Sequence, residues 1–596
     1  MRNAKIALGI ISKRGSKKQP IERIYRLLYN PELYQMAYRN IYANDGAMTK
    51  GSNDETVDGM SMKKIMDIIG RVKTETYQWT PVRRTHIKKS NGKLRPLGLP
   101  TWSDKLLQEA MRIILEAYYD GQFSENSHGF REGRGCQTAL EAITRKGGWK
   151  SVKWFVEGDI ANCFGSIDHE ILMNILKERI KDNRFLRLIE NLLKSGYMEN
   201  WKHSPTLSGC PQGSILSPIL SNVYMDKLDK YVENELIPKY TKGKRRAENK
   251  EYKAIMNQIA KYKRHQNWEK ARELEKISQT MASKEPTDPN FRRLYYIRYA
   301  DDWLIGISGS REEAEEVKTQ IAGYLHRELK LELSGEKTLV THARNEKARF
   351  LGYDIHVLHA DTKHDHRGQR IINGAIGLRV PRDKMQAKMS EYMARGKPIH
   401  RKERTINSDY DIISQYQSEL RGFVQYYLHA YNAHEMHNVK RAMEMSLAKT
   451  LANKYKTTSK RIFDDYKTTV ETENGKYKVL QAKVERENKS SLIAQFGGIR
   501  IAYDKEATIT DAPKQIYNVK SQLIDRLTRK VCELCGTPGE TSMHHVRKLK
   551  DLSKSGRKNK PEWMKRMIAM NRKTLAVCDS CHNKIHSGEY DGPKVC

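Results

Sequence analysis

Apolar residues recur at helical spacing in several long stretches of the chain. Residues 21–44 show this period with an interruption at Pro31, and residues 104–119 carry an unbroken apolar stripe. A stripe of this kind predicts an amphipathic helix that buries one face. We expect further helices over 168–195 and a basic helical region over 380–465.

Shorter apolar runs bounded by turn residues predict strands. Residues 82–100 fit two strands joined at Asn91-Gly92, a dipeptide that favours tight hairpins. Residues 152–160 and 294–308 form two more apolar, β-rich runs, and strand signals return around 350–358. Helices and strands are therefore mixed along the chain, which predicts an α+β protein of several domains.

The segment 235–290 differs from its surroundings. It is charged, almost free of glycine, and rich in lysine, arginine, glutamate and glutamine. Such a composition predicts an inserted helical hairpin or a partly mobile arm.

Composition narrows the partners of the protein. The 596 residues are enough for about three to five domains. The formal net charge of +36 is spread along the chain, and a field of this size attracts polyanions, above all nucleic acid. One alternative is a basic protein whose charge serves only solubility. Binding to an anionic membrane surface is a weaker alternative, because no long basic amphipathic helix stands out.

The sequence shows no signal for a membrane or for secretion. It has no apolar run of about 18 residues, and its N-terminal apolar stretch spans only six. We therefore expect a cytoplasmic protein, with its eight cysteines reduced unless a metal holds them.

Three aspartates follow or interrupt apolar runs. Asp301 and Asp302 lie side by side where a hairpin turn is expected, and Asp159 ends another strand-like run. Carboxylates that converge repel one another unless cations lie between them. Two Mg²⁺ ions about 3.5–4 Å apart would relieve that repulsion and serve in-line phosphoryl transfer. Aspartate is also an ordinary turn residue, so the pair by itself is weak evidence.

The order of the surrounding motifs is more specific. The motifs are LRPLGLP (94–100), SHGFREGRG (127–135), GDIANCFGSIDH (158–169), GCPQGSILSP (209–218) and YADD (299–302). In this order they resemble the reverse transcriptases. YANDGAMTKGSNDETVDG (42–59), LSGEKTLVTHARNEKARFLGY (333–353) and SELRGFVQYYLHA (418–430) extend the resemblance, over the whole chain, to group II intron-encoded proteins of the lactococcal type.

The resemblance implies roles for residues of a polymerase centre. Asp159 and Asp301 match the metal-binding pair, Asp302 is the adjacent acid, and Ile160 would lend its carbonyl to a metal. Other residues would hold the nucleotide as finger cations on the triphosphate, an aromatic gate against the 2′-hydroxyl, and a loop glutamine: Arg83, Lys89, Arg95, Phe164 and Gln212. Core packing is the alternative for the aromatic residue, and a solvated basic hairpin is the alternative for the cations.

One helical segment combines a positive charge with several aromatic residues. Arg421, Tyr426 and Tyr427 lie in it, and this mixture suits RNA and a primer–template duplex. Tyrosines at helical spacing are about as often core residues. The excess of basic residues predicts nucleic-acid binding that depends strongly on salt.

Two C-x₂-C pairs mark the C-terminal region. They are Cys532 with Cys535 and Cys578 with Cys581, with 42 residues between the pairs. Four thiolates in a tetrahedral array form a closed structural zinc site. The separation is longer than in zinc ribbons, so the loop between the pairs is a functional insert or part of a different fold.

Histidines accompany these cysteines. His544 and His545 lie between the two pairs, and His582 and His586 follow the second. The pattern resembles the HNH nuclease domain of group II intron proteins. It implies His545 as the general base and a divalent ion held by His544 with His582 or His586. Asn571 would be the central asparagine, a little farther from Cys578 than expected, and a zinc-stabilised DNA-binding module without cleavage is the alternative.

The expected architecture is a right-handed polymerase with fingers and palm, an α-helical thumb, and a small zinc-stabilised ββα-metal nuclease. The expected regions are an N-terminal extension of the fingers (1–80), fingers and palm (81–365, with the insertion 235–290), a thumb or maturase domain (366–480), a DNA-binding region (481–525) and the nuclease (526–596).

The resemblance implies three activities that act in intron mobility. They are RNA-directed DNA polymerisation, maturase assistance to intron splicing, and cleavage of the second target strand. The implied partners are intron RNA, target DNA and dNTPs in the bacterial cytoplasm, with a homodimer as a further option. The alternative functions are an RNA-binding splicing cofactor on a polymerase fold that has lost its activity, and a free-standing reverse transcriptase.

Overall fold

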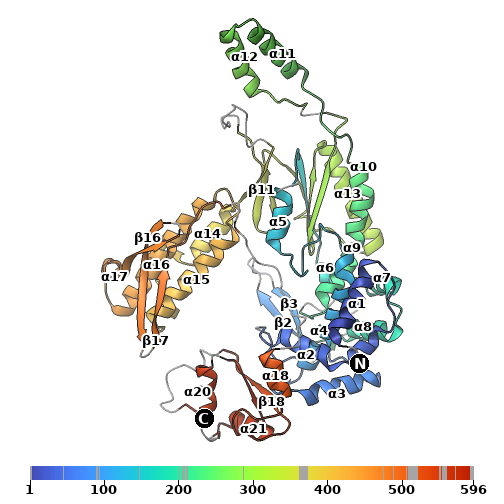
Figure 1. Cartoon of the computed structure of the whole chain (residues 1–596), viewed down its shortest axis with the longest axis vertical. Helices are drawn as coiled ribbons and strands as arrows, with labels where there is room; N and C mark the ends of the chain where they lie inside the picture. The colour runs from blue at the N-terminus through green and yellow to red at the C-terminus, as the bar shows by residue number, and fades with distance from the viewer. Residues whose placement is uncertain are drawn as a thin grey trace.

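A four-stranded antiparallel sheet forms the centre of this computed structural model (Figure 1). Its strands, in the spatial order β7-β8-β4-β9, are β7 (Leu294–Tyr299), β8 (Asp302–Ile307), β4 (Trp154–Asp159) and β9 (Leu339–His342). The structure describes residues 3–44, 46–88, 92, 94–145, 148–199, 202–204, 209, 213–285, 288–360, 374–473, 475–486, 489–504, 507, 521–548, 552, 560–570 and 572–590.

The two faces of the sheet are buried in two different cores. Val156, Trp303 and Ile305 belong to a core shared with the N-terminal region, whereas Phe155 and Leu304 belong to a core shared with the helical region that follows. Neighbouring residues of a strand point to opposite faces. A strand covered on both faces therefore reads as a continuous apolar run, as it does here.

Long helices contribute to the core on the first face. They are α4 (Trp102–Tyr119), α9 (Ser217–Tyr231) and α13 (Arg311–Leu329), of which α13 packs against β4 and β9. The stripe at 104–119 is thus confirmed as a helix, and the Thr101 side chain caps it by accepting a hydrogen bond from the Asp104 N–H at 3.4 Å. The prediction over 168–195 is confirmed as two helices, α7 (His169–Arg179) and α8 (Asn183–Lys194).

The N-terminal helices pack around α4. They are α1 (Ala4–Ser16), α2 (Pro31–Ile41) and α3 (Met62–Lys73), with a 3₁₀ helix (Ile24–Tyr29) before α2. Pro31 does not interrupt a longer helix but opens α2, where a missing N–H is no loss and Asn30 provides the cap.

The hairpin expected to belong to the fingers consists of β2 (Val82–Lys88) and β3 (Leu94–Leu99), and its pairing agrees with the two strands expected over 82–100. β2 also runs parallel to β5 (Tyr197–Glu199), which pairs with β6 (Lys202–Ser204). Lys89 and Asn91 lie outside the described residues.

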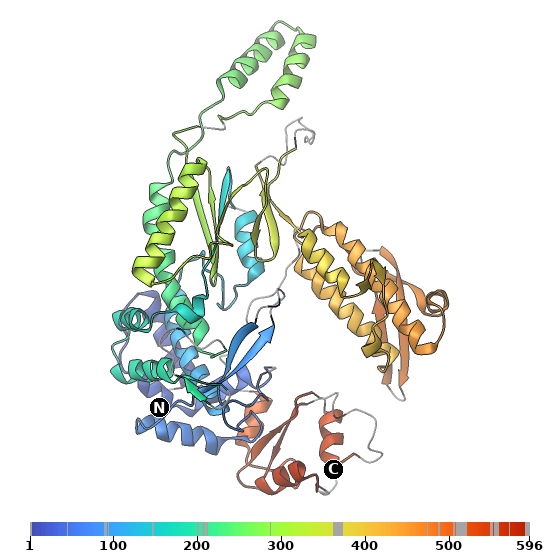
Figure 2. The ribbon, with the colours of Figure 1, turned by 180° about the vertical axis from the view of Figure 1, so that it is seen from behind.

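The charged insertion is a helical hairpin of α11 (Lys250–Arg264) and α12 (Trp268–Thr280) at one end of the molecule (Figures 1 and 2). Isolated β-bridges between Lys242 and Arg292 and between Glu248 and Lys284 close its stem. Of the two alternatives drawn from the sequence, the structure has the hairpin.

The helical region after the central sheet forms a separate lobe in both views (Figures 1 and 2). A small sheet of β10 (Ala348–Phe350), β11 (Tyr353–Val357) and β12 (Ile376–Arg379) leads into it. The helices are α14 (Arg382–Ser390), α15 (Asp409–Tyr426), α16 (His437–Tyr455) and α17 (Ser459–Tyr466). A second sheet follows, with β15 (Lys467–Thr472), β16 (Gly475–Arg486) and β17 (Lys489–Phe496). β16 runs across residue 480, where one region was expected to end and the next to begin.

The C-terminal module lies against the N-terminal helices (Figure 1). It contains α18 (Gln522–Thr528), β18 (Ser542–His545), α20 (Glu562–Ala569), β19 (Thr574–Val577) and α21 (Asp579–Ser587). β1 (Met60–Ser61), from the N-terminal extension, pairs with β18 and completes a three-stranded sheet. Among the described residues, the helices are too short or too polar to cross a membrane.

Candidate polymerase and nuclease centres

The three predicted acids meet at one end of the central sheet. Asp159 ends β4 and is the cross-strand partner of Asp302, the first residue of β8. Asp301 lies in the turn between β7 and β8, so the hairpin carries it to the same edge. The Lys337 ammonium group lies 2.7 Å from Asp159 Oδ2. A cation therefore already contacts this carboxylate cluster, although the sequence analysis did not single out Lys337.

The carboxyl groups of Asp301 and Asp302 are hard to ionise together. Burial raises the pKa of Asp301, and the negative charge of Asp159 raises it further. Burial, with the contacts to Asp159 and Asp301, raises the pKa of Asp302 to about 7. Carboxyl groups whose pKa values are raised by mutual repulsion favour bound cations, because a cation between two carboxylates lowers their repulsion. The donor set thus fits the divalent ions expected from the sequence.

A buried ion pair supports the turn that carries Asp301. The Arg298 guanidinium donates two hydrogen bonds to Asp229, at 2.7 and 2.6 Å, and both side chains are fully buried. Arg298 also donates to the carbonyl of Ala300 at 2.8 Å. Burial by itself lowers the pKa of Arg298. The negative charge of Asp229 has the larger effect and raises the pKa of Arg298 above its usual range. Arg298 is a positioning residue that sequence reasoning missed.

The segment of the SHGFREGRG motif packs directly behind this turn. The His128 N–H donates to the Arg298 carbonyl at 2.9 Å, and the Asn222 amide donates to the Gly129 carbonyl at 2.8 Å. A Cβ on Gly129 would lie 2.4 Å from the Ala300 nitrogen, so only glycine allows this approach. The motif therefore acts on the acids through the backbone of the turn.

The predicted nucleotide-binding residues are only partly described. Arg95 lies on β3 and acts electrostatically on Asp301, where it opposes the rise in pKa. Arg83 donates to the Lys50 carbonyl at 2.8 Å and lines a cavity of about 420 Å³ with Lys50. Lys89 and Gln212 lie outside the described residues, so their predictions are left as made.

Ile160 and Phe164 follow Asp159 along the chain. The Ile160 side chain is buried in the core, and an isolated β-bridge joins Ile160 to Leu333. Phe164 is half-buried, with its ring 6.0 Å from that of Phe130 in an edge-to-face arrangement. These positions leave the predicted roles of the Ile160 carbonyl and the Phe164 ring as predictions.

The three predicted RNA-contacting residues have different environments. Arg421 is exposed on α15. Tyr427 is buried and donates to the Gly352 carbonyl at 3.1 Å, and Tyr426 is half-buried and donates to the Leu351 carbonyl at 2.8 Å. Both tyrosines join the end of α15 to the turn between β10 and β11. The burial of Tyr427 argues against its contact with RNA. Of the three predicted RNA-contacting residues, Arg421 is the exposed one.

The four C-terminal cysteines come together as predicted. Their Sγ atoms all lie within 4.8 Å of one another, and the Cys535 and Cys578 sulfurs are 3.8 Å apart. Zn–S bonds of about 2.3 Å give a tetrahedron with edges of about 3.8 Å. Hydrogen bonding to Thr537 lowers the pKa of Cys535 to about 6, which favours the thiolate that binds metal. This group of residues fits a zinc ion.

The predicted nuclease ligands also come together, but with one addition. His544 lies on β18, and His582 and His586 lie one turn apart on α21. Asp58, from the N-terminal extension, joins them, and the four ligand atoms lie within 4.8 Å of one another. No local signal in the sequence connects Asp58 with histidines almost 500 residues away. Asn571 lies outside the described residues.

His545 has a different environment from the other histidines. It is buried, its Nε2 lies 3.0 Å from the Tyr38 hydroxyl, and its Nδ1 lies 3.0 Å from the Met543 carbonyl oxygen. Burial lowers its pKa to about 4, so the ring is neutral near pH 7. α2 therefore covers the predicted general base in this arrangement, and both of its ring nitrogens contact oxygen atoms of the protein.

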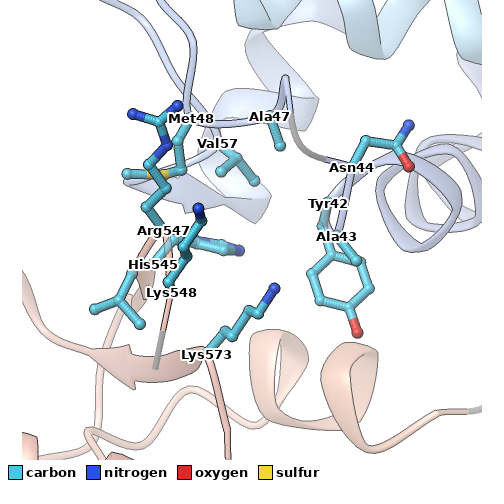
Figure 3. A pocket seen from close by; sticks show the side chains of 11 residues that line it. Tyr42, Ala43, Asn44, Ala47, Met48, Val57, His545, Arg547, Lys548 and Lys573 are labelled. Atoms are coloured by element: carbon cyan, nitrogen blue, oxygen red, sulfur yellow. The ribbon is translucent and has the colours of Figure 1, made fainter. Parts of the chain in front are cut away.

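A cavity of about 230 Å³ separates this histidine from the loop after α2. Figure 3 shows Arg547, Lys548 and Lys573 lining it, opposite the loop residues Ala43 and Asn44. All three basic residues are exposed. Cations gathered beside a nuclease centre suit the phosphates of a nucleic acid.

Comparison with protein families divides the chain into three matches. Residues 87–355 match reverse transcriptase (RNA-dependent DNA polymerase), residues 378–502 match the type II intron maturase family, and residues 532–582 match the AI2M/AI1M-like HNH endonuclease family. These ranges contain the acid cluster, the helical lobe and most of the cysteine and histidine clusters.

Similarity to individual proteins extends over almost the whole chain. A group II intron-encoded protein, LtrA, from Lactococcus lactis subsp. cremoris is 40% identical over 94% of this chain and 95% of its own length. The putative COX1/OXI3 intron 2 protein of Saccharomyces cerevisiae is 31% identical over 96% of this chain and 67% of its own. An uncharacterised 91 kDa protein in the cob intron of Schizosaccharomyces pombe is 32% identical over 97% and 72%. With its polymerase, maturase and HNH regions in this order, the chain belongs to the multifunctional group II intron-encoded proteins, as an RNA-directed DNA polymerase and an HNH DNA endonuclease.

Proposed function

We propose that Asp159 and Asp301 hold the two Mg²⁺ ions of the polymerase, with Asp302 as the supporting acid. The observation that supports this most is the convergence of the three carboxyl groups at one end of paired strands. Mg²⁺ held there, with the Ile160 carbonyl, would activate the primer hydroxyl and offset the charge of the dNTP. Lys337 would give up its contact with Asp159 as the cations enter.

The nucleotide itself is assigned to the finger hairpin and the loops that face the acids. Arg83, Lys89 and Arg95 offset the triphosphate charge, because guanidinium and ammonium groups form strong hydrogen bonds to phosphate oxygens. Phe164 excludes a 2′-hydroxyl by contact, and Gln212 contacts the incoming nucleotide. Arg95 supports this assignment, since its charge acts on Asp301.

The maturase region binds intron RNA, and we assign Arg421 as one contact because it is exposed on α15. This role needs binding energy but no chemistry from the protein. The resulting ribonucleoprotein acts in the bacterial cytoplasm, and a homodimer is one form it can take.

The nuclease is assigned a divalent ion on His544, His582 and His586, and His545 as the base that takes a proton from water. The cysteine cluster holds a structural zinc ion that stabilises the module. In mobility, intron RNA inserts into one target strand, the nuclease cuts the other, and the cut 3′ end primes DNA synthesis.

One experiment with two reciprocal variants tests these assignments. Asp301→Asn is expected to abolish cDNA synthesis while intron splicing and second-strand nicking continue. His586→Ala is expected to abolish nicking while polymerisation and splicing continue, since its side chain is 56% exposed and its removal leaves no buried gap. Each variant is the control for the other, and Asp67→Asn, an exposed acid on α3, controls for general charge effects. Loss of splicing in Asp301→Asn would contradict the separation of roles.

A further inference from the structure

The Asp58 carboxylate lies among the three nuclease histidines. Asp58 Oδ1 is 3.4 Å from His544 Nδ1 and 3.2 Å from His582 Nε2, and Asp58 Oδ2 is 2.7 Å from His586 Nε2. The two α21 histidines bring their Nε2 atoms within 3.2 Å of each other. A tetrahedral ion with metal–ligand bonds of about 2.0–2.1 Å has edges of about 3.3 Å between its ligand atoms. Three of these four distances match that edge.

A second observation comes from His544. Its ring is buried, with its side chain only 5% exposed; within the described part of the chain neither nitrogen has a partner in hydrogen-bond geometry, and Nδ1 contacts only the Asp58 carboxylate at 3.4 Å. A buried imidazole whose nitrogens make no hydrogen bond is unfavourable, and a bound cation removes the penalty. Three imidazoles with one carboxylate suit a first-row transition ion, because Mg²⁺ prefers oxygen ligands.

The chain holds Asp58 in this position firmly. The His545 N–H donates to Asp58 Oδ1 at 2.7 Å, and the Gly59 N–H donates to the Met543 carbonyl at 3.1 Å. The neighbouring strand pair β1–β18 packs Met60 against the fully buried Met543. Five residues of the C-terminal module belong to the same apolar core as the N-terminal helices: Leu523, Ile524, Leu527, Met543 and Ala576. The interface between the N-terminal extension and the C-terminal module thus holds Asp58 in place.

A catalytic metal site keeps one position open for water or substrate, whereas a closed site has four protein ligands. We propose that Asp58 is the fourth ligand of the nuclease metal and occupies the position that the scissile phosphate requires. The N-terminal extension of the polymerase thereby holds the nuclease closed until Asp58 leaves. The Tyr38–His545 contact belongs to the same closed state, since α2 covers the base while β1 delivers the acid. This inference rests on the proposed nuclease function and adds the polymerase as its regulator.

Co²⁺ binding to the full-length protein tests the ligand. Asp58→Asn retains an oxygen that accepts the His545 N–H but removes the anionic ligand. Its Co²⁺ affinity at the histidine site, followed by visible absorption, is expected to fall about tenfold or more, since even partners of metal ligands are worth about 10- to 100-fold. Asp54→Asn is the matched control, because Asp54 is 92% exposed in the same segment. Thiolate-to-cobalt bands report the cysteine cluster separately and are expected to stay unchanged.

DNA nicking at saturating Co²⁺ then tests closure. Asp58→Asn is expected to nick faster than the wild type and the Asp54→Asn control. Equal Co²⁺ affinity in wild type and Asp58→Asn would overturn the ligand assignment. Weaker binding with slower nicking at saturation would overturn closure and make Asp58 a productive ligand. Absence of nicking in every protein, with the affinity difference retained, would overturn the proposed nuclease function while the ligand assignment stands.

Discussion

Single residues decide how the polymerase acids are presented. Arg298 satisfies Asp229 and, through a further hydrogen bond, fixes the carbonyl of Ala300. Arg298 and Asp229 form an ion pair without solvent exposure, so the removal of one side chain leaves the charge of the other buried without a counter-charge. The same pair thus contributes to both stability and the geometry of the turn.

Arg298→Met is expected to lower the free energy of unfolding by about 3–5 kcal/mol, since it leaves the Asp229 charge buried without its counter-charge and, among the described residues, with only the Tyr296 hydroxyl as a partner. The double variant Arg298→Met, Asp229→Leu removes both charges and is expected to recover most of that stability. Its cDNA synthesis is expected to stay low, because Ala300 still lacks its hydrogen bond. Urea unfolding and primer extension measure the two effects. Full recovery of activity in the double variant would contradict a positioning role.

His128 gives the polymerase core a pH dependence. Burial lowers its pKa from 6.5 to about 4, and the nearby Arg134 lowers it further in the same direction. The folded state therefore resists protonation of this ring, while the unfolded chain accepts a proton below about pH 6.5. The neutral ring contributes stability above pH 6.5, and this contribution is lost as the pH falls towards 4.

We expect wild-type thermal stability to decline between pH 6.5 and pH 4 more steeply than that of His128→Gln. The difference between the two proteins is expected to reach the order of 3 kcal/mol, from about 1.4 kcal/mol for each pKa unit. Melting curves across this range, for both proteins in the same buffers, measure the contribution. Parallel pH profiles would show that His128 is not the group responsible.

At the scale of elements, the helical hairpin α11–α12 is nearly independent of the rest. Its two buried apolar side chains, Ile259 and Ala271, pack between its own helices, and the ion pair of Lys263 with Glu275 joins them at 2.7 Å. Elements that contact mainly themselves add little to the stability of the parent fold.

Replacement of residues 250–280 with a short glycine–serine linker is therefore expected to leave the melting temperature within about 3 °C of the wild type. The bridges of Lys242 with Arg292 and of Glu248 with Lys284 remain to close the stem. Primer extension on a short template is expected to continue at the wild-type rate. A large loss of stability would mean that the hairpin supports the palm.

The sequence predicted elements well where the information is local. The two paired strands expected over 82–100, the apolar runs that end at Asp159 and begin after Asp302, and the two C-x₂-C pairs each depend on neighbours along the chain. It did not predict Lys337 beside Asp159 or Asp58 beside His544, because these contacts join residues 178 and 486 positions apart. Tyr427 shows a further limit, since a tyrosine at helical spacing serves a core or an RNA surface equally well.

At the scale of the whole molecule, the fold brings the two ends of the chain together. The N-terminal extension supplies β1 and Asp58 to the nuclease, and the C-terminal module supplies apolar residues to the N-terminal core. Polymerase and nuclease therefore share an interface, whereas the helical lobe stands apart from it (Figure 2). For a molecule with a net charge of +36 and this layout, we expect separate surfaces for its two polyanions.

Salt dependence distinguishes those surfaces. Each phosphate contact adds about 0.9 to the slope of log affinity against log salt for duplex DNA. Arg547→Gln with Lys573→Gln removes two exposed cations from the cavity beside His545. The slope for target DNA is expected to fall by about two, while the slope for intron RNA is unchanged. Lys261→Gln with Lys270→Gln, on the distant helical hairpin, is the charge-matched control, and its DNA slope is expected to equal that of the wild type. An equal fall of the DNA slope and the RNA slope in Arg547→Gln with Lys573→Gln would contradict the prediction. It would mean that these cations attract both nucleic acids alike and that the two do not bind to separate surfaces.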